Sequence, residues 1–189
     1  MTHDPVRHRR RSRRLPAYDY HQPGAYFVTI CIQDRERILG EVARDQVVPS
    51  DAGKMIESVW RELPERYSGV GLDAFVVMPN HLHGIVVLVG AGPRACPENA
   101  GRVPPPGQPQ GVAPTGTISL PDVVRRFKSL TAAKYRQGIR DNGWPPFPRR
   151  LWQRNYYEHV IRDDEDLDRI RRYVAENPLR WKEDPENVL

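Results

Sequence analysis

Residues 72–89 read LDAFVVMPNHLHGIVVLV, and this stretch decides the fold. Its two halves are rich in β-branched and aromatic residues, which favour strands. Only Pro79, Asn80 and at most His81 separate the two apolar runs. Since a connection this short joins antiparallel neighbours, residues 72–78 and 82–89 are predicted to form a β-hairpin.

Further strands and helices are predicted on both sides of this hairpin. Residues 25–32 (AYFVTICI) form a strand that is apolar on both faces, and residues 151–161 form a strand or hairpin. Apolar residues at helical spacing predict helices over residues 51–63, 122–131 and 163–174. The first helix should end near Pro64 and the last at Pro178. Candidate N-caps are Ser50 or Asp51, Ser119 or Asp122, and Asp163 or Asp164.

The resulting element order is β-α-β-β-α-β-α. It favours the α+β class, with a single antiparallel sheet and helices packed on it in a ferredoxin-like or RRM-like sandwich.

Two segments have the composition of unfolded chain. Residues 1–20 are predicted to be a flexible basic arm, because six of the first 14 residues are arginines and one is acidic. Residues 90–117 hold seven prolines and six glycines and are predicted to be a disordered insertion. The predicted organisation is therefore the arm at 1–20, a domain at 21–182 that the insertion at 90–117 interrupts, and a tail at 183–189.

Composition narrows the class of protein. The 189 residues suggest one domain plus tails, and no apolar run approaches the roughly 18–20 residues of a membrane span. Two cysteines make neither a disulfide framework nor a zinc set, so a cytoplasmic protein is predicted. Residues 119–154 hold nine Lys/Arg against two acids. With the basic arm, this segment indicates a polyanionic partner, although a solvated tail and ordinary helix surfaces would give the same charge.

His81 and His83 are the first candidate site. On a strand they point to the same face with Cα atoms about 6.5 Å apart, so two imidazoles can converge on one ion. A closed structural zinc site takes four ligands, whereas two histidines suit an open site that recruits a third. The alternative is a hydrogen-bonded histidine pair without a metal.

Tyr173 and Asn177 are the second candidate site. Four residues apart on a helix, they share a face. A tyrosine hydroxyl can attack a phosphodiester, and the Asn177 oxygen could complete a metal shell. Alternatively, Tyr173 packs into the core and Asn177 with Pro178 merely ends the helix.

Aromatic and basic residues alternate in residues 127–129 and 152–157, a mixture that suits single-stranded nucleic acid. Trp152 is the exception, because a core position is favoured for it. Tyr156 and Tyr157 point to opposite faces of a strand, so at most one of them can approach the site.

Six motifs in order resemble one family. They are RRSRRL (10–15), GAYFVT (24–29), VMPNHLH (77–83), FKS (127–129), LWQR (151–154) and YVAENP (173–178). The set, which spans residues 10–182, resembles the REP-associated tyrosine transposase (RAYT) branch of the single-tyrosine HUH transposases.

The resemblance implies a metal-dependent enzyme that cleaves and rejoins single-stranded DNA at hairpin-forming, REP-like repeats through a 5′-phosphotyrosine. His81, His83 and Asn177 would bind Mg²⁺ or Mn²⁺, and Tyr173 would be the nucleophile. The ligand types favour Mn²⁺ and cellular abundance favours Mg²⁺. The residues expected to contact DNA are Arg10, Arg11, Arg13, Arg14, Arg125, Arg126, Lys128 and Arg154.

Several expectations stay open. The protein is expected to associate with the nucleoid and not with a membrane, as a monomer or a homodimer. A catalytically inactive or domesticated RRM-like DNA-binding protein would show the same charge pattern. A metal-free phosphoesterase would need two His-x-Ser/Thr motifs, which the chain lacks.

Overall fold

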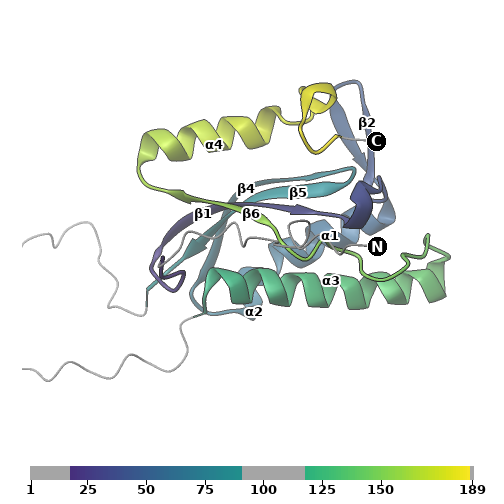
Figure 1. Cartoon of the computed structure of the whole chain (residues 1–189), viewed down its shortest axis with the longest axis horizontal. Coiled ribbons are helices and arrows are strands. Elements are labelled where there is room, and N and C mark those ends of the chain that lie inside the picture. The colour runs from purple at the N-terminus through teal and green to yellow at the C-terminus, as the bar shows by residue number, and fades with distance from the viewer. Residues whose placement is uncertain (1–17, 91–117, 188–189) are drawn as a thin grey trace, which may run out of the picture.

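The computed structural model describes residues 18–90 and 118–187 (Figure 1). Its main sheet is antiparallel, with the strand order β4-β5-β1-β6. The four strands are β1 (Gly24–Cys31), β4 (Val70–Met78), β5 (His81–Leu88) and β6 (Tyr157–Ile161). The helices are α1 (Asp51–Arg61), α2 (Leu63–Arg66), α3 (Leu120–Asn142) and α4 (Asp164–Glu176), with 3₁₀ turns η2 (Gln33–Arg35) and η3 (Trp181–Glu183).

The sheet separates two layers of helices. Helices α1, α2 and α3 cover one face, and α4 lies across the other face (Figure 1). The larger core packs Trp60 and Phe127 from the helices against Tyr26 and Leu82 of the sheet. The predicted α+β class and helix-covered antiparallel sheet are confirmed, and the predicted elements occur in the predicted order, with α2 and a short two-stranded ribbon added.

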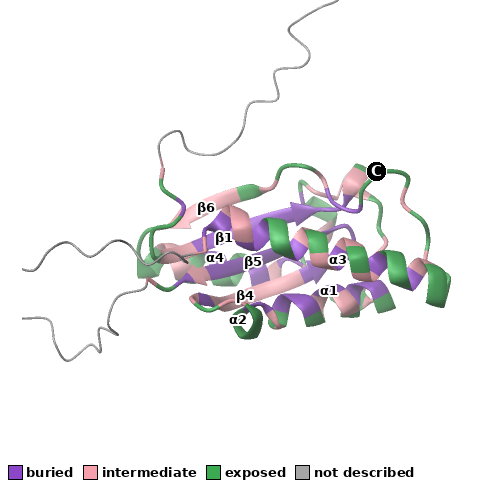
Figure 2. Cartoon of the chain, turned by 90° about the horizontal axis from the view of Figure 1, so that it is seen from below, coloured by how far each residue is buried: buried purple, intermediate pink, exposed green. Residues whose placement is uncertain are grey.

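A smaller core lies under α4. Ile170 and Val174 of this helix pack on Phe27 of β1 and Ile85 of β5. Strands β1 and β5 are therefore buried on both faces, as their continuous apolar runs predict (Figure 2).

The helix starts follow the predicted caps. The side chains of Ser50, Ser119 and Asp163 accept backbone N–H groups of the first helical turn at 3.1, 3.3 and 2.8 Å. The predicted end near Pro64 is wrong in detail, because α1 ends at Arg61 and Pro64 lies in the first turn of α2. Proline is tolerated there, since first-turn N–H groups have no helical partner.

Three segments differ from the predictions. Helix α3 runs on past residue 131 to Asn142 and ends at Gly143, whose φ of 67° is left-handed. Only residues 157–161 of the predicted 151–161 segment form a strand, while Trp152 makes an isolated bridge to Ile32. A two-stranded ribbon of β2 (Gly40–Ala43) and β3 (Gln46–Pro49) was not predicted.

Several predictions fall outside the described residues. These are most of the arm at 1–20 and of the insertion at 90–117, together with Arg10, Arg11, Arg13 and Arg14. Within residues 18–90 and 118–187, no helix has both the length and the apolar character needed to cross a bilayer.

Candidate metal and nucleophile site

Strand β5 sets the direction of the two candidate histidines. His81 lies opposite Cys31 and His83 opposite Thr29 on β1, and both precede Ile85 at two-residue spacing. Since Ile85 packs under α4, strand alternation places all three side chains on the α4 face. Helix α4 is thus the element that can bring a further group to the imidazoles.

The two imidazoles converge, and the outer nitrogen of each ring is hydrogen-bonded. Their Nε2 atoms are 2.9 Å apart, and each ring is almost fully buried. The outer nitrogens are occupied: His81 Nδ1 bonds Asn80 Oδ1 at 2.8 Å and His83 Nδ1 bonds Thr29 Oγ1 at 2.9 Å. Such outer contacts fix the orientation of metal-binding histidines.

The lowered pKa of His81 keeps the imidazole neutral and so favours metal binding. Burial, and next the charge of His83, hold its pKa well below the ordinary value. A neutral imidazole has a lone pair available for a cation.

Tyr173 lies beside this pair. Its hydroxyl is 3.4 Å from His83 Nε2, and its ring stands edge-on to Phe27 at 5.9 Å between centroids. Burial, then the charge of Asp184, raises the pKa of Tyr173, while the neighbouring Asn177 amide opposes this rise. The phenol therefore keeps its proton unless a positive charge is brought close.

Asn177 also faces the site. It is the C-cap of α4 with helical φ and ψ of −57° and −40°, although the following proline disfavours that backbone. The residue is 2% exposed, and its Oδ1 has no hydrogen-bond partner among the described residues. A buried carbonyl oxygen without a partner is costly, and a cation would satisfy it.

Asp184 completes the group and was not predicted. Its Oδ2 lies 3.8 Å from His81 Nε2 and 3.7 Å from His83 Nε2. Burial would raise its pKa, but the neighbouring His83 imidazole and the hydrogen bond from the Glu186 N–H outweigh burial and hold it at about 2. Asp184 therefore brings a full negative charge to two buried imidazoles.

The segment that carries Asp184 is tied to the sheet. Glu186 forms an ion pair with Arg35 and accepts a hydrogen bond from Cys31 Sγ at 3.1 Å. Its backbone oxygen accepts from Asn80 Nδ2 at 2.8 Å, so the residue beside His81 also anchors this segment. The only feature of the sequence that could have indicated Asp184 is that an acidic residue follows a helix-ending proline. This pattern is too common to indicate a site.

These side chains fit a divalent cation. The donor atoms of His81, His83 and Asp184 all lie within 4.8 Å of one another. Asp184 Oδ2, like Asn177 Oδ1, is buried without a hydrogen-bond partner in the described part of the chain. Two imidazole nitrogens and two oxygens suit Mn²⁺ or Mg²⁺ better than a closed zinc site.

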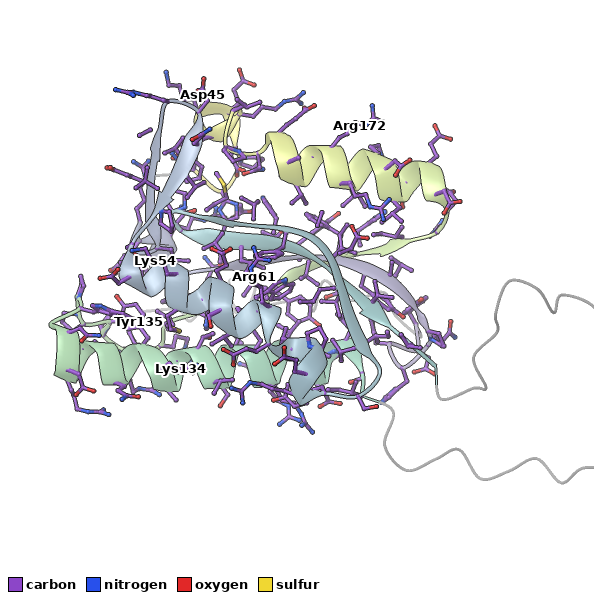
Figure 3. All side chains as sticks on the ribbon, turned by 180° about the vertical axis from the view of Figure 1, so that it is seen from behind. Asp45, Lys54, Arg61, Lys134, Tyr135 and Arg172 are labelled. Atoms are coloured by element: carbon purple, nitrogen blue, oxygen red, sulfur yellow. The ribbon has the colours of Figure 1, made fainter. Side chains whose placement is uncertain are left out.

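The structure does not bring the predicted α3 residues to this site. Arg125 pairs with Asp122 at 2.7 Å, and Arg126 lies over the Tyr67 ring at 4.9 Å. Lys134 of α3 and Arg172 of α4 lie on opposite outer sides of the molecule (Figure 3). DNA on the basic side of α3 would therefore lie across the sheet from the histidines.

Lys128 and Arg154 lie together. The Lys128 ammonium donates to the backbone oxygens of Gln153, Arg154 and Asn155 at 2.9, 3.4 and 3.1 Å. It thereby ties α3 to the segment leading into β6. The Arg154 side chain is exposed.

The aromatic residues divide as expected. Trp152 is 4% exposed, and its indole N–H donates to Thr131 Oγ1 at 2.8 Å, so the predicted core position is confirmed. Tyr156 packs against the larger core, whereas Tyr157 lies opposite Thr29 and lines the cavity beside the histidines.

Known proteins are similar to this chain in sequence and in fold. No family model matches the chain. A *Haemophilus influenzae* protein of uncharacterized function is 34% identical over 183 residues, which are 94% of this chain and 92% of that protein. A second *H. influenzae* protein, provisionally named a REP-associated tyrosine transposase, is 28% identical over 166 residues, 86% of this chain and 74% of its own length.

A solved structure gives the same fold. It is a REP-associated tyrosine transposase bound to a REP hairpin, and it matches with a TM-score of 0.53 at 18% identity over 89% of this chain and 74% of its own. In this chain, β5 presents His81 and His83 to Tyr173 of α4. The chain is similar to the REP-associated tyrosine transposases, the branch that its six motifs predict.

Proposed function

We propose that the protein is a metal-dependent, single-strand DNA endonuclease and strand transferase that acts at hairpin-forming, REP-like repeats. The observation that carries the proposal is the 3.4 Å approach of the Tyr173 hydroxyl to His83 Nε2. This approach joins a nucleophile to a cluster whose donor atoms fit a divalent cation.

The chemistry would be a transesterification at Tyr173. A cation held by His81, His83, Asn177 and Asp184 would supply positive charge for the phenolate and for the phosphate oxygens. The Tyr173 hydroxyl gives up its proton to solvent, and its oxygen attacks phosphorus and forms a new P–O bond. The 3′-oxygen leaves with the electrons of the broken bond and takes a proton.

The products are a 5′-phosphotyrosine and a free 3′-OH. One phosphodiester replaces another, so a second 3′-OH can reverse the step and join strands without ATP. The protein would thus cleave and rejoin DNA at one centre.

The DNA partner is supported by the relatives and by charge. The similar solved structure holds a REP hairpin, and 29 Lys/Arg against 24 acids leave this chain with a net charge of +5. Arg10, Arg11, Arg13 and Arg14 are proposed to bind backbone phosphates. Arg125, Arg126, Lys128 and Arg154 stay predictions, and of these Arg125, Arg126 and Arg154 are exposed.

A gel assay tests the reaction. The protein is incubated with single-stranded oligonucleotides from the DNA that flanks its gene, with Mn²⁺ or with EDTA, and separated under denaturing conditions. The wild type should form a covalent adduct only with Mn²⁺, and Tyr173→Phe should form none. Tyr157→Phe is the matched control, because it removes another hydroxyl from the same cavity.

Two outcomes would reject the proposal. An adduct or a nick made by Tyr173→Phe would exclude Tyr173 as the nucleophile. Tight DNA binding by the wild type without any adduct would instead support a DNA-binding protein that lacks catalysis.

A further inference from the structure

A cavity of about 650 Å³ extends from His83 along β6 under α4. This volume is within the range of sites that bind small ligands. The far part of the cavity is lined by Tyr157 and His159 of β6 and by Arg169 of α4, none of which is part of the metal cluster. The chemistry proposed for Tyr173 leaves this part of the cavity without a role.

Tyr157 offers an aromatic surface in the cavity. It is 47% exposed, an unusual position for a large ring on a strand next to the core. Phe27 contacts it edge-to-face at 6.3 Å between centroids and so supports the ring from one side. Tyr157 lies opposite Thr29, which lies opposite His83, so it is two strands, or about 10 Å, from the metal ligand.

Asp166 fixes the polar wall of the same cavity. It accepts from His159 Nε2 at 2.7 Å and forms an ion pair with Arg169. One carboxylate thus orients an imidazole from the sheet and a guanidinium from the helix. The remaining N–H groups of Arg169 can bind a phosphate, because a guanidinium carries five donors and one contact does not exhaust them.

We infer that this cavity binds one unstacked nucleotide of the DNA strand, next to the phosphate that Tyr173 attacks. The base stacks on Tyr157, and the phosphate of the same nucleotide pairs with Arg169. Aromatic rings with adjacent cations are the usual means of holding single strands without reading a sequence. The inference rests on the proposed function, since it needs a DNA strand at Tyr173, but it concerns binding and not cleavage.

Binding measurements test the inference without requiring cleavage. Full-length Tyr173→Phe protein is titrated with fluorescently labelled single-stranded hexathymidylate and with an abasic oligomer of equal length, and anisotropy gives each Kd. Adding Tyr157→Ala should weaken hexathymidylate binding by about 5- to 150-fold, the range measured for one base on an aromatic ring. Binding of the abasic oligomer should stay unchanged.

Further variants separate the contributions of the Tyr157 ring, the Tyr157 hydroxyl and the Arg169 charge to DNA binding. Tyr157→Phe should keep the affinity, because the ring remains. Arg169→Ala should weaken both oligomers equally, because it contacts the backbone. The controls are Val48→Ala, another exposed apolar side chain at 51% exposure, and Arg162→Ala, an exposed arginine that does not line the cavity.

The outcomes distinguish this inference from the proposed function. Equal weakening of both oligomers by Tyr157→Ala, or no weakening of either, would overturn the nucleotide site. The same loss in Tyr157→Phe would overturn base stacking. Base-dependent binding that requires Tyr157 supports the site even if the wild type never forms an adduct, a result that rejects only the catalytic proposal.

Discussion

Replacing Gly84 by alanine tests how tightly the sheet packs against helix α1. Gly84 lies between His83 and Ile85 on β5, and its missing side chain would point at the buried indole of Trp60. A Cβ at residue 84 would lie 2.5 Å from Trp60 Cζ2, 3.0 Å from Trp60 Cε2 and 3.2 Å from Phe75 Cβ. Trp60 is fully buried and packs edge-on against Phe127 at 5.1 Å, so the indole has no free space into which to move.

Gly84→Ala should therefore lower the free energy of unfolding by about 2–3 kcal/mol, the upper part of the usual range for overpacking. For a chain of this size, the melting temperature should fall by about 4–12 °C. Equilibrium unfolding in urea, followed by tryptophan fluorescence, measures the change directly.

Gly71→Ala is the matched control on the neighbouring strand. The nearest atom to a Cβ there is Val87 Cβ at 3.4 Å, an ordinary contact. Its effect should stay within about 0.5 kcal/mol. A loss below about 0.5 kcal/mol for Gly84→Ala would refute the close-packing explanation of this glycine. A double variant with Trp60→Phe should lose less than the sum of the single losses, because the two positions share one space.

Three further changes have defined outcomes. Asp73→Asn should lower the free energy of unfolding by about 1 kcal/mol at pH 7, because it removes the negative charge and one of the two oxygens that accept from Arg171 at 2.9 and 2.7 Å. Arg171 holds the pKa of Asp73 below its usual value. The difference in free energy of unfolding between Asp73→Asn and the wild type, measured with urea, should therefore persist above about pH 4 and vanish as the pH falls further. A difference that does not change with pH would contradict the ion pair. Trp152→Phe should cost about 1–3 kcal/mol in the same assay, because it removes the indole donor to Thr131, and an unchanged midpoint would argue against that bond. Asp184→Asn should raise the calorimetric Kd for Mn²⁺ about tenfold or more, whereas an unchanged Kd would remove this carboxylate from the ligand set.

The elements that strong local patterns specify were predictable. Strand alternation alone places His81 and His83 on one face, and helical spacing places Tyr173 and Asn177 together. What the sequence could not give is the docking of α4 on that face of the sheet. That docking depends on Ile170 and Val174 meeting Phe27 and Ile85, residues far apart along the chain.

The missed features lack a local signal. The β2–β3 turn has left-handed φ values of 52° at Arg44 and 61° at Asp45, positions where glycine or asparagine usually marks such a turn. Asp184 reaches the histidines only because its segment folds back, held by the pairing of Glu186 with Arg35. Lys128 looks like a phosphate ligand in the sequence, but three backbone oxygens already surround its ammonium.

The place of β6 in the sheet bears on how the molecule is made. Residues 157–161 pair with residues 25–29, so the ribosome must synthesise about 130 further residues before β1 gains this neighbour. Contacts this distant in sequence form slowly, because the intervening chain must first be ordered. A nascent chain can close the hairpin that carries both histidines early in synthesis, but Tyr173 can reach His83 only after β6 and α4 have been translated. The two parts of the candidate site are thus separated in time by translation itself.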